Sequence, residues 1–127
     1  MKLASIFPET MGYYFSKVLE GTHSQDAAHH EFGKLHVELI LDKYDKFRRE
    51  LEDRGEIRAK DYLSYEIDEI LYPLNKLKDF FAQPDKSNLT PRDAAIFAEF
   101  ARDRHDKMLE IANEIDEEYQ EKNEPRH

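Results

Sequence analysis

Cysteine is absent from the sequence of 127 residues. Its absence excludes disulfide bonds, thiolate nucleophiles and zinc–thiolate sites, and it fits a reducing compartment. No run approaches the ~20 apolar residues that a transmembrane helix needs. The N-terminal residues reach Pro8 and Glu9 before an apolar core develops, so we expect no signal peptide. We therefore expect a cytoplasmic protein that does not insert into a membrane.

Glycine and proline are scarce, with four and five residues respectively, and long segments contain neither. Because little turn-forming material is present, we expect an all-α protein. The length is that of one domain, which we assign to residues 1–122, and we expect a disordered tail over residues 123–127. The predicted fold is a mostly antiparallel helical bundle of three long helices plus one short N-terminal helix.

Apolar spacing and turn residues predict four helices, over residues 9–20, 24–54, 57–82 and 91–121. Gly21 and Gly55 are expected to end the first two helices, and Ser24 is the expected N-cap of the second. Thr90 and Pro91 have the residue types that favour the N-cap and the first helical position of the fourth helix. The connections are short, which favours antiparallel neighbours.

Each long predicted helix carries apolar residues three or four positions apart, the pattern of one buried helix face. In the third helix these residues are Leu63, Ile67, Ile70, Leu74, Leu77 and Phe81. In the second helix they are Phe32, Leu35, Leu39, Ile40, Tyr44, Phe47 and Leu51. In the fourth helix, Phe97 and Phe100 widen a similar stripe. We expect these stripes to form the core, and we expect Pro73, inside the third helix, to remove one helix hydrogen bond.

Acidic residues exceed basic ones, 28 to 19, which gives a formal net charge of −9. Direct binding to nucleic acid or to an anionic membrane requires a basic face, so this balance argues against both. A strongly acidic protein is suited to a partner whose surface is basic. We therefore expect a protein partner with a basic surface.

Two features, a surplus of aromatic residues and an acidic helix end, are candidate partner-binding sites. Tyr13, Tyr14 and Phe15 are consecutive, and at 100° per residue they fan around the helix, so one flat contact cannot bury all three. Phe80 and Phe81 are a second group of consecutive aromatic residues that a partner could contact. The C-terminal part of the fourth predicted helix supplies carboxylates that would steer a basic partner. These carboxylates belong to Glu110, Glu114, Glu117, Glu118 and Glu121.

A metal site inside the bundle is an alternative, with His36, Glu66, Glu69 and His105 as its ligands. The Glu-x-x-His pairs of di-iron bundles are absent. Helical nucleotide pyrophosphohydrolases hold magnesium with Glu-x-x-Glu followed by Glu-x-x-Asp, and only the first spacing occurs here. Glu99 and Asp103, the candidates for the second pair, are four positions apart. We therefore assign no metal ligand and no cofactor, and we expect partly buried histidines hydrogen-bonded to Tyr or Glu.

Arg104 lies beside the apolar stripe of the fourth predicted helix. We interpret it as a side chain whose aliphatic stem covers the edge of the core while its guanidinium reaches water. An ion pair with Glu66 or Glu69 is the alternative.

No motif of a phosphate-binding loop, a nucleophile elbow or a calcium loop is present, so an enzymatic function is not favoured. The sequence is most consistent with a non-enzymatic acidic binding protein that occludes a basic surface of a macromolecular partner. Small acidic helical inhibitors, immunity proteins, antitoxins and phage inhibitors act in this way. The alternatives are a metal-dependent bundle enzyme and a structural subunit of a homodimer or larger homo-oligomer.

Overall fold

The computed structural model describes residues 3–54 and 57–123, without the side chains of residues 54, 57–63 and 119–123. Within these ranges the protein is all-α, with no strand. The elements are a 3₁₀ helix η1 (Leu3–Ile6), α1 (Met11–Thr22), α2 (Ala27–Arg54), α3 (Ile57–Ala82), a 3₁₀ helix η2 (Pro84–Lys86) and α4 (Pro91–Asn123). This confirms the predicted fold class of three long helices and one short N-terminal helix. Of the predicted tail, Asn123 ends α4, and residues 124–127 lie outside the described residues.

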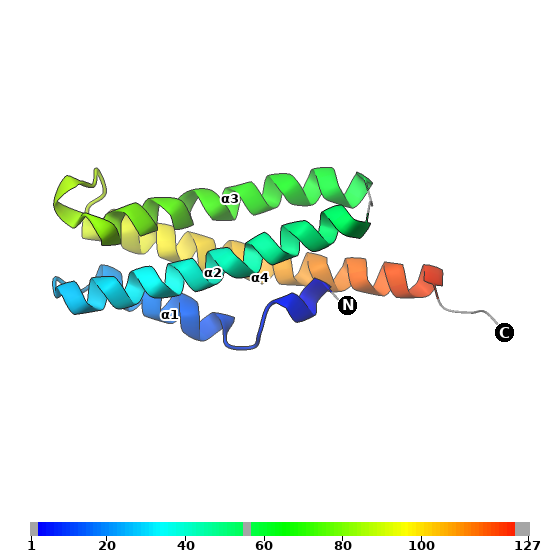
Figure 1. Ribbon diagram of the computed structural model, residues 1–127, viewed down its shortest axis with the longest axis horizontal. Coiled ribbons are helices and arrows are strands. Elements are labelled where there is room, and N and C mark those ends of the chain that lie inside the picture. Colours follow the sequence, from blue (N-terminus) through cyan, green and yellow to red (C-terminus); the bar gives the residue numbers. More distant parts are fainter. Residues whose placement is uncertain (1–2, 55–56, 124–127) are drawn as a thin grey trace.

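The four α-helices form a ring in which each helix packs against two others. The packed pairs are α1 with α2, α2 with α3, α3 with α4, and α4 with α1. Successive helices run in opposite directions (Figure 1). With 12 residues, α1 is about 18 Å long, much shorter than the helices beside it. The preceding 3₁₀ helix η1 extends the α1 side by packing on both α2 and α4.

The 3₁₀ helix η1 was not predicted, and it is held by the carboxylate of Asp116 on α4. The Oδ1 atom accepts the backbone N–H of Leu3 at 2.7 Å, and the Oδ2 atom accepts that of Ala4 at 3.0 Å. Both Asp116 and Leu3 are buried. The predicted first helix began at Glu9, whereas α1 begins two residues later, after a turn in which the N–H of Met11 donates to the carbonyl of Pro8 at 3.0 Å.

The start of α4 is as predicted, whereas the start of α2 is not. The Thr90 hydroxyl accepts the backbone N–H of Asp93 at 3.1 Å, which confirms Thr90 as the N-cap of α4. At α2 the cap is Asp26, whose carboxylate accepts the N–H of Ala28 at 2.9 Å. The predicted cap, Ser24, instead accepts the N–H of Asp26, so α2 begins at Ala27.

The predicted stripe of α3 forms part of the core. Ile67, Ile70, Leu74, Leu77 and Phe81 are all buried, whereas the side chain of Leu63 lies outside the described residues. From α2, Tyr44 and Phe47 are fully buried. The Phe81 ring is packed so closely on α2 that a Cβ atom at Gly33 would lie 2.9 Å from its Cζ atom. The absence of a side chain at Gly33 thus permits this contact.

The predictions for several other aromatic and aliphatic side chains had different outcomes. Phe80 and Phe81 are both buried, so neither is available to a partner. Conversely, Phe32, Leu35 and Phe100, predicted as core residues, are exposed. The reason is that, among the described residues, each α-helix packs closely on two other α-helices, so an apolar stripe wider than those contacts remains partly uncovered. No helix among the described residues is long and apolar enough to cross a membrane.

Candidate functional site

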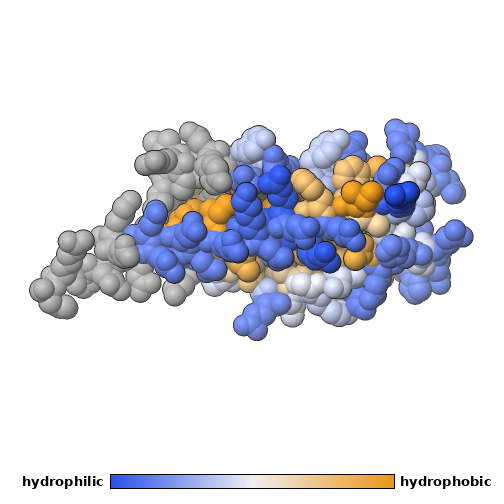
Figure 2. Space-filling view, turned by 180° about the vertical axis from the view of Figure 1, so that it is seen from behind, coloured by the Kyte–Doolittle hydropathy of each residue, from blue (hydrophilic) through white to orange (hydrophobic). Residues whose placement is uncertain are grey.

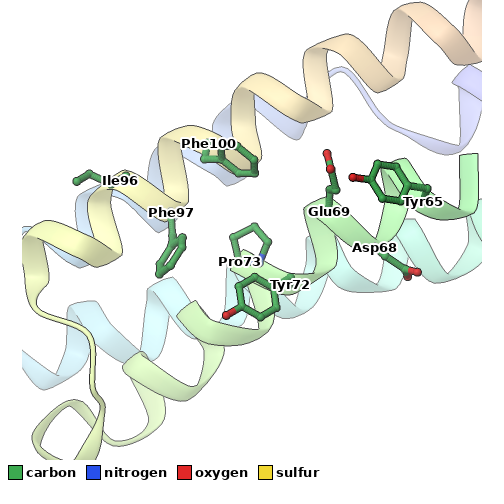
Figure 3. A pocket seen from close by; sticks show the side chains of 8 residues that line it. All are labelled: Tyr65, Asp68, Glu69, Tyr72, Pro73, Ile96, Phe97 and Phe100. Carbon is green, nitrogen blue, oxygen red and sulfur yellow. The ribbon is translucent and has the colours of Figure 1, made fainter.

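The outer side of the α3–α4 pair carries an apolar groove of about 490 Å³. We call it the α3–α4 groove. Its lining residues are Tyr65, Asp68, Glu69, Tyr72, Pro73, Ile96, Phe97 and Phe100 (Figure 3). The first five come from α3 and the last three from α4, so the antiparallel packing of these two helices creates the groove.

The walls of the groove are large apolar side chains that remain open to solvent. Tyr65 is 64% exposed, Tyr72 61% and Ile96 54%. Phe100 is also exposed, so four of the seven large hydrophobic side chains found exposed in the described part of the chain line this groove. Seen from the α4 side, apolar surface is visible within a border of hydrophilic side chains (Figure 2).

The floor of the groove is formed by Pro73 and Phe97. Pro73 is buried, and Phe97 is partly buried and points between the two helices toward Tyr72 (Figure 3). Because proline has no backbone N–H, Pro73 cannot donate the usual helix hydrogen bond to the carbonyl of Glu69. Helix α3 nevertheless continues through Pro73 to Ala82.

Glu69 and Arg104 form the polar end of the groove. The Nη1 atom of Arg104 lies 3.3 Å from Oε2 of Glu69 and 3.8 Å from Oε2 of Glu66, and its guanidinium lies 5.1 Å from the centroid of the Phe100 ring. The predicted alternative for Arg104, an ion pair with these two carboxylates, is therefore present. The Arg104–Glu69 contact lacks hydrogen-bond geometry, so the buried Oε2 atom of Glu69 has no hydrogen-bond partner.

Two further lining residues have polar partners. The phenol of Tyr65 points toward the carboxylate of Glu69, and the hydrogen bond to that carboxylate is the main cause that raises the pKa of Tyr65 (Figure 3). Asp68 turns away from the groove and pairs with Arg48 of α2 at 2.5 Å. Of the two acidic residues that line the groove, only Glu69 directs its carboxylate into the groove.

Sequence reasoning missed the α3–α4 groove because it assigned Phe97 and Phe100 to the core and did not use the tyrosines of α3. A signal was nevertheless present. Tyr65 and Tyr72 are seven positions apart, outside the main stripe of α3, so they share one side of the helix. Ile96 and Phe100 are four positions apart on α4 and likewise share one side.

The three consecutive aromatic residues predicted as a partner site have different environments. Phe15 is a core residue, 2% exposed, whose ring lies 5.3 Å from that of His105. Tyr14 is partly buried, and Tyr13 is 51% exposed. The rings of Tyr13 and Tyr14 each lie 5.7 Å from the imidazole of His36 on α2. Phe15 is thus excluded from a surface site, while Tyr13 remains accessible on the α1–α2 side.

The predicted carboxylate site lies on a different element, near the C-terminal end of α4. Glu110, Glu114, Glu117 and Glu118 are exposed, and the side chain of Glu121 lies outside the described residues. Asp116, in the middle of this run, is instead buried against η1. The aromatic and acidic sites predicted from the sequence therefore occupy separate helices.

The four residues of the alternative metal site are not gathered around one point. Nδ1 of His36 lies 2.8 Å from the backbone oxygen of Phe32, whereas Nδ1 of His105 lies 2.5 Å from the hydroxyl of Tyr44. Glu66 and Glu69 face Arg104. No group of three or more His, Asp or Glu residues that could hold a metal ion occurs in the part of the chain that the structure describes.

Comparison of this chain with protein families, curated proteins and solved structures found no match.

Proposed function

We propose that this protein is a non-enzymatic binding protein. It holds apolar side chains of a protein partner in the α3–α4 groove and covers a basic surface of that partner with its carboxylates. The observation that carries the proposal is the gathering of Tyr65, Tyr72, Ile96 and Phe100 around one groove. Large apolar patches that stay exposed within a polar rim are typical of protein-interaction sites.

The residue types in the groove support a protein partner. Aromatic side chains are enriched among the residues that dominate binding energy, because each buries a large area at a low cost in side-chain entropy. Tyr65 and Tyr72 also keep a hydroxyl group that can hydrogen-bond at the edge of a contact. A partner that covers these rings together would remove more apolar surface from water than a partner that covers one exposed aromatic residue elsewhere.

The charge of the protein supports a basic partner. The net charge of −9 favours encounter with a positively charged surface and increases the association rate at low ionic strength. Exposed carboxylates at Glu110, Glu114, Glu117 and Glu118 extend this field along α4. A second copy of the chain carries the same net charge and is therefore disfavoured as the occupant of the groove.

The mode of action that fits these features is occlusion. A bundle whose helices are already packed on one another presents the groove without first having to fold, so little binding energy is spent on ordering it. Such a protein would act as an inhibitor, an immunity protein or an antitoxin, by covering the site with which its partner binds its own ligand. We place this action in the cytoplasm, since the sequence has no cysteine that an oxidising compartment would pair.

The test is affinity capture with the purified protein from a lysate of the source organism, followed by titration of each captured protein in purified form. The groove variant is Ile96→Asp with Phe100→Asp, and the matched control is Tyr13→Asp, an exposed aromatic residue on the α1–α2 side. We expect a partner with a basic surface that binds the wild type and the control alike and the groove variant at least about tenfold more weakly.

Two outcomes would contradict this proposal. If the captured protein binds the groove variant as tightly as the wild type, the groove is not the binding site. If light scattering shows a dimer that the groove variant abolishes, a second copy occupies the groove. Circular dichroism of the groove variant must match that of the wild type, which we expect because both substituted side chains are exposed.

A further inference from the structure

We propose that the segment of the partner that enters the α3–α4 groove is an amphipathic α-helix. Its apolar residues recur at three- and four-residue spacing, and lysine or arginine residues flank them. This inference rests on the proposed function, since it describes the partner at the same groove. Three properties of the groove lead to it: its dimensions, the state of the backbone in its walls, and its charge.

The walls of the groove have the length of two helical turns. Tyr65 and Tyr72 are seven residues apart on α3, which corresponds to about 10 Å along the helix axis. Ile96 and Phe100 are four residues apart on the opposite wall, about 6 Å. A helix that lies along the groove would place residues i, i+3 or i+4, and i+7 against these walls, the spacing by which amphipathic helices occupy such grooves.

The backbone of the walls favours a helix over an extended segment. Both walls are α-helices, whose backbone N–H and C=O groups are bonded within the helix, so they offer no edge to which an extended segment could add as a strand. An extended segment in the groove would therefore bury backbone groups without partners. A helix satisfies its own backbone hydrogen bonds and can bury side chains alone.

The charge of the groove favours basic residues beside the apolar face of that helix. Asp68 and Glu69 line the groove, and no lysine or arginine does so among the described residues. Cations lie next to it: Arg48 pairs with Asp68, Arg104 with Glu69, and Lys76 lies 5.6 Å from the centroid of the Tyr72 ring.

These cations do not remove the preference for a basic partner. The side chain of Glu69 remains 26% exposed at the polar end of the groove, although its Oε2 atom is buried beside Arg104. A lysine or arginine side chain of the incoming helix can approach the exposed part of this carboxylate, and charge-assisted hydrogen bonds are stronger than neutral ones. The net charge of −9 acts in the same direction over a longer distance.

The test is selection from a displayed library of random peptides of about 16 residues, a length at which an isolated helix is only marginally stable. Immobilised full-length protein is the target, and an excess of soluble Ile96→Asp/Phe100→Asp protein removes peptides that bind elsewhere. The enriched peptides are synthesised and titrated against the wild type, the groove variant, Glu69→Gln and the control Tyr13→Asp. Circular dichroism of each complex reports whether the peptide becomes helical.

We expect enriched peptides with apolar residues at three- and four-residue spacing and an excess of lysine and arginine. They should become helical on binding, and a proline placed at their centre should weaken binding at least about tenfold. Glu69→Gln should weaken binding of the basic peptides about three- to tenfold, while Tyr13→Asp leaves it unchanged. In labelled wild-type protein, the amide resonances of residues 65–73 and 96–100 should shift.

Enriched peptides without helical spacing, peptides that tolerate the central proline, or a selection without enrichment would each overturn the inference. The proposed function would fail differently. It fails if no captured partner depends on the groove, whatever the peptides show. If a captured partner depends on the groove but cross-links to it through a non-helical segment, the proposed function stands and the helical occupant is wrong.

Discussion

The hydroxyl of Tyr44 on α2 lies 2.5 Å from Nδ1 of His105 on α4, and this hydrogen bond connects two helices that face each other diagonally across the bundle. The rings of Phe7 and Phe15 lie 5.0 and 5.3 Å from the imidazole. His105 is 3% exposed, and burial lowers its pKa from 6.5 to about 4, although nearby Asp106 opposes this shift. Burial, followed by the charge of Asp106, raises the pKa of Tyr44.

Because His105 is buried, we expect the stability of the protein to fall as the pH is lowered. In the unfolded chain the imidazole takes up a proton below pH 6.5, whereas in the folded protein it stays neutral until about pH 4. Between these values the unfolded state binds more protons, so the free energy of unfolding decreases as the pH falls. We expect His105 to account for a loss of about 3 kcal/mol between pH 7 and pH 4.

This contribution is measured by urea unfolding at several pH values with the wild type and with His105→Gln. The glutamine variant should lack that share of the pH dependence, although its stability at pH 7 is lower. His23→Gln, a change at an exposed histidine, is the control and should keep the full wild-type slope. Equal slopes for the wild type and His105→Gln would show that His105 is not held neutral by the fold.

The carboxylate of Asp116 predicts a specific loss of stability at the N-terminus. Asp116→Ala removes the acceptor for the buried N–H groups of Leu3 and Ala4, and we expect the free energy of unfolding to fall by about 1 to 3 kcal/mol. Glu117→Ala, at the exposed neighbour, should change it by less than about 0.5 kcal/mol. Hydrogen exchange should accelerate at the amides of Leu3 and Ala4 in the first variant alone, and unchanged exchange there would contradict the assignment.

The contact between Phe81 and Gly33 predicts that two glycine-to-alanine substitutions have opposite effects. Gly33→Ala places a Cβ atom 2.9 Å from a ring that is itself buried, and we expect it to destabilise the protein by about 1 to 3 kcal/mol. At Gly12 a Cβ atom meets nothing within 4 Å, so Gly12→Ala should stabilise α1 by up to about 1 kcal/mol. Thermal unfolding compares the two. A smaller ring, in Gly33→Ala/Phe81→Leu, should restore part of the loss.

At Pro73 we expect one substitution to raise the stability of the protein and to weaken its binding at the groove. Pro73→Ala restores a backbone N–H in the interior of α3 and removes a ring from the floor of the groove. We expect the free energy of unfolding to rise by about 1 to 2 kcal/mol, since a proline inside a helix costs about 3 kcal/mol and the lost ring contacts offset part of the gain. Binding of peptides selected on the groove should weaken. A variant whose stability does not rise and whose binding is unchanged would contradict both expectations.

Features that depend on neighbours in the chain were predictable. The four helices, the buried stripe of α3 and the Thr90 cap follow from residue spacing and from hydrogen bonds made within one turn, and the structure contains all of them. The predicted N-cap of α2, Ser24, was wrong because Ser24 and Asp26 are both residue types that cap helices well. Only the path of the loop decided between them.

The sequence by itself determined an acidic all-α bundle, because helical periodicity and net charge are local or additive properties. It did not determine which aromatic side chains stay at the surface. Phe15 and Phe80 are buried, while Phe100 is exposed, and nothing in their spacing separates them. The tertiary structure decided this, because the angular position of the neighbouring helices around each described helix fixes which part of an apolar stripe remains uncovered. The α3–α4 groove lies where Tyr65 and Tyr72, outside the main stripe of α3, face Ile96 and Phe100 of α4 and no other helix of the described residues covers them.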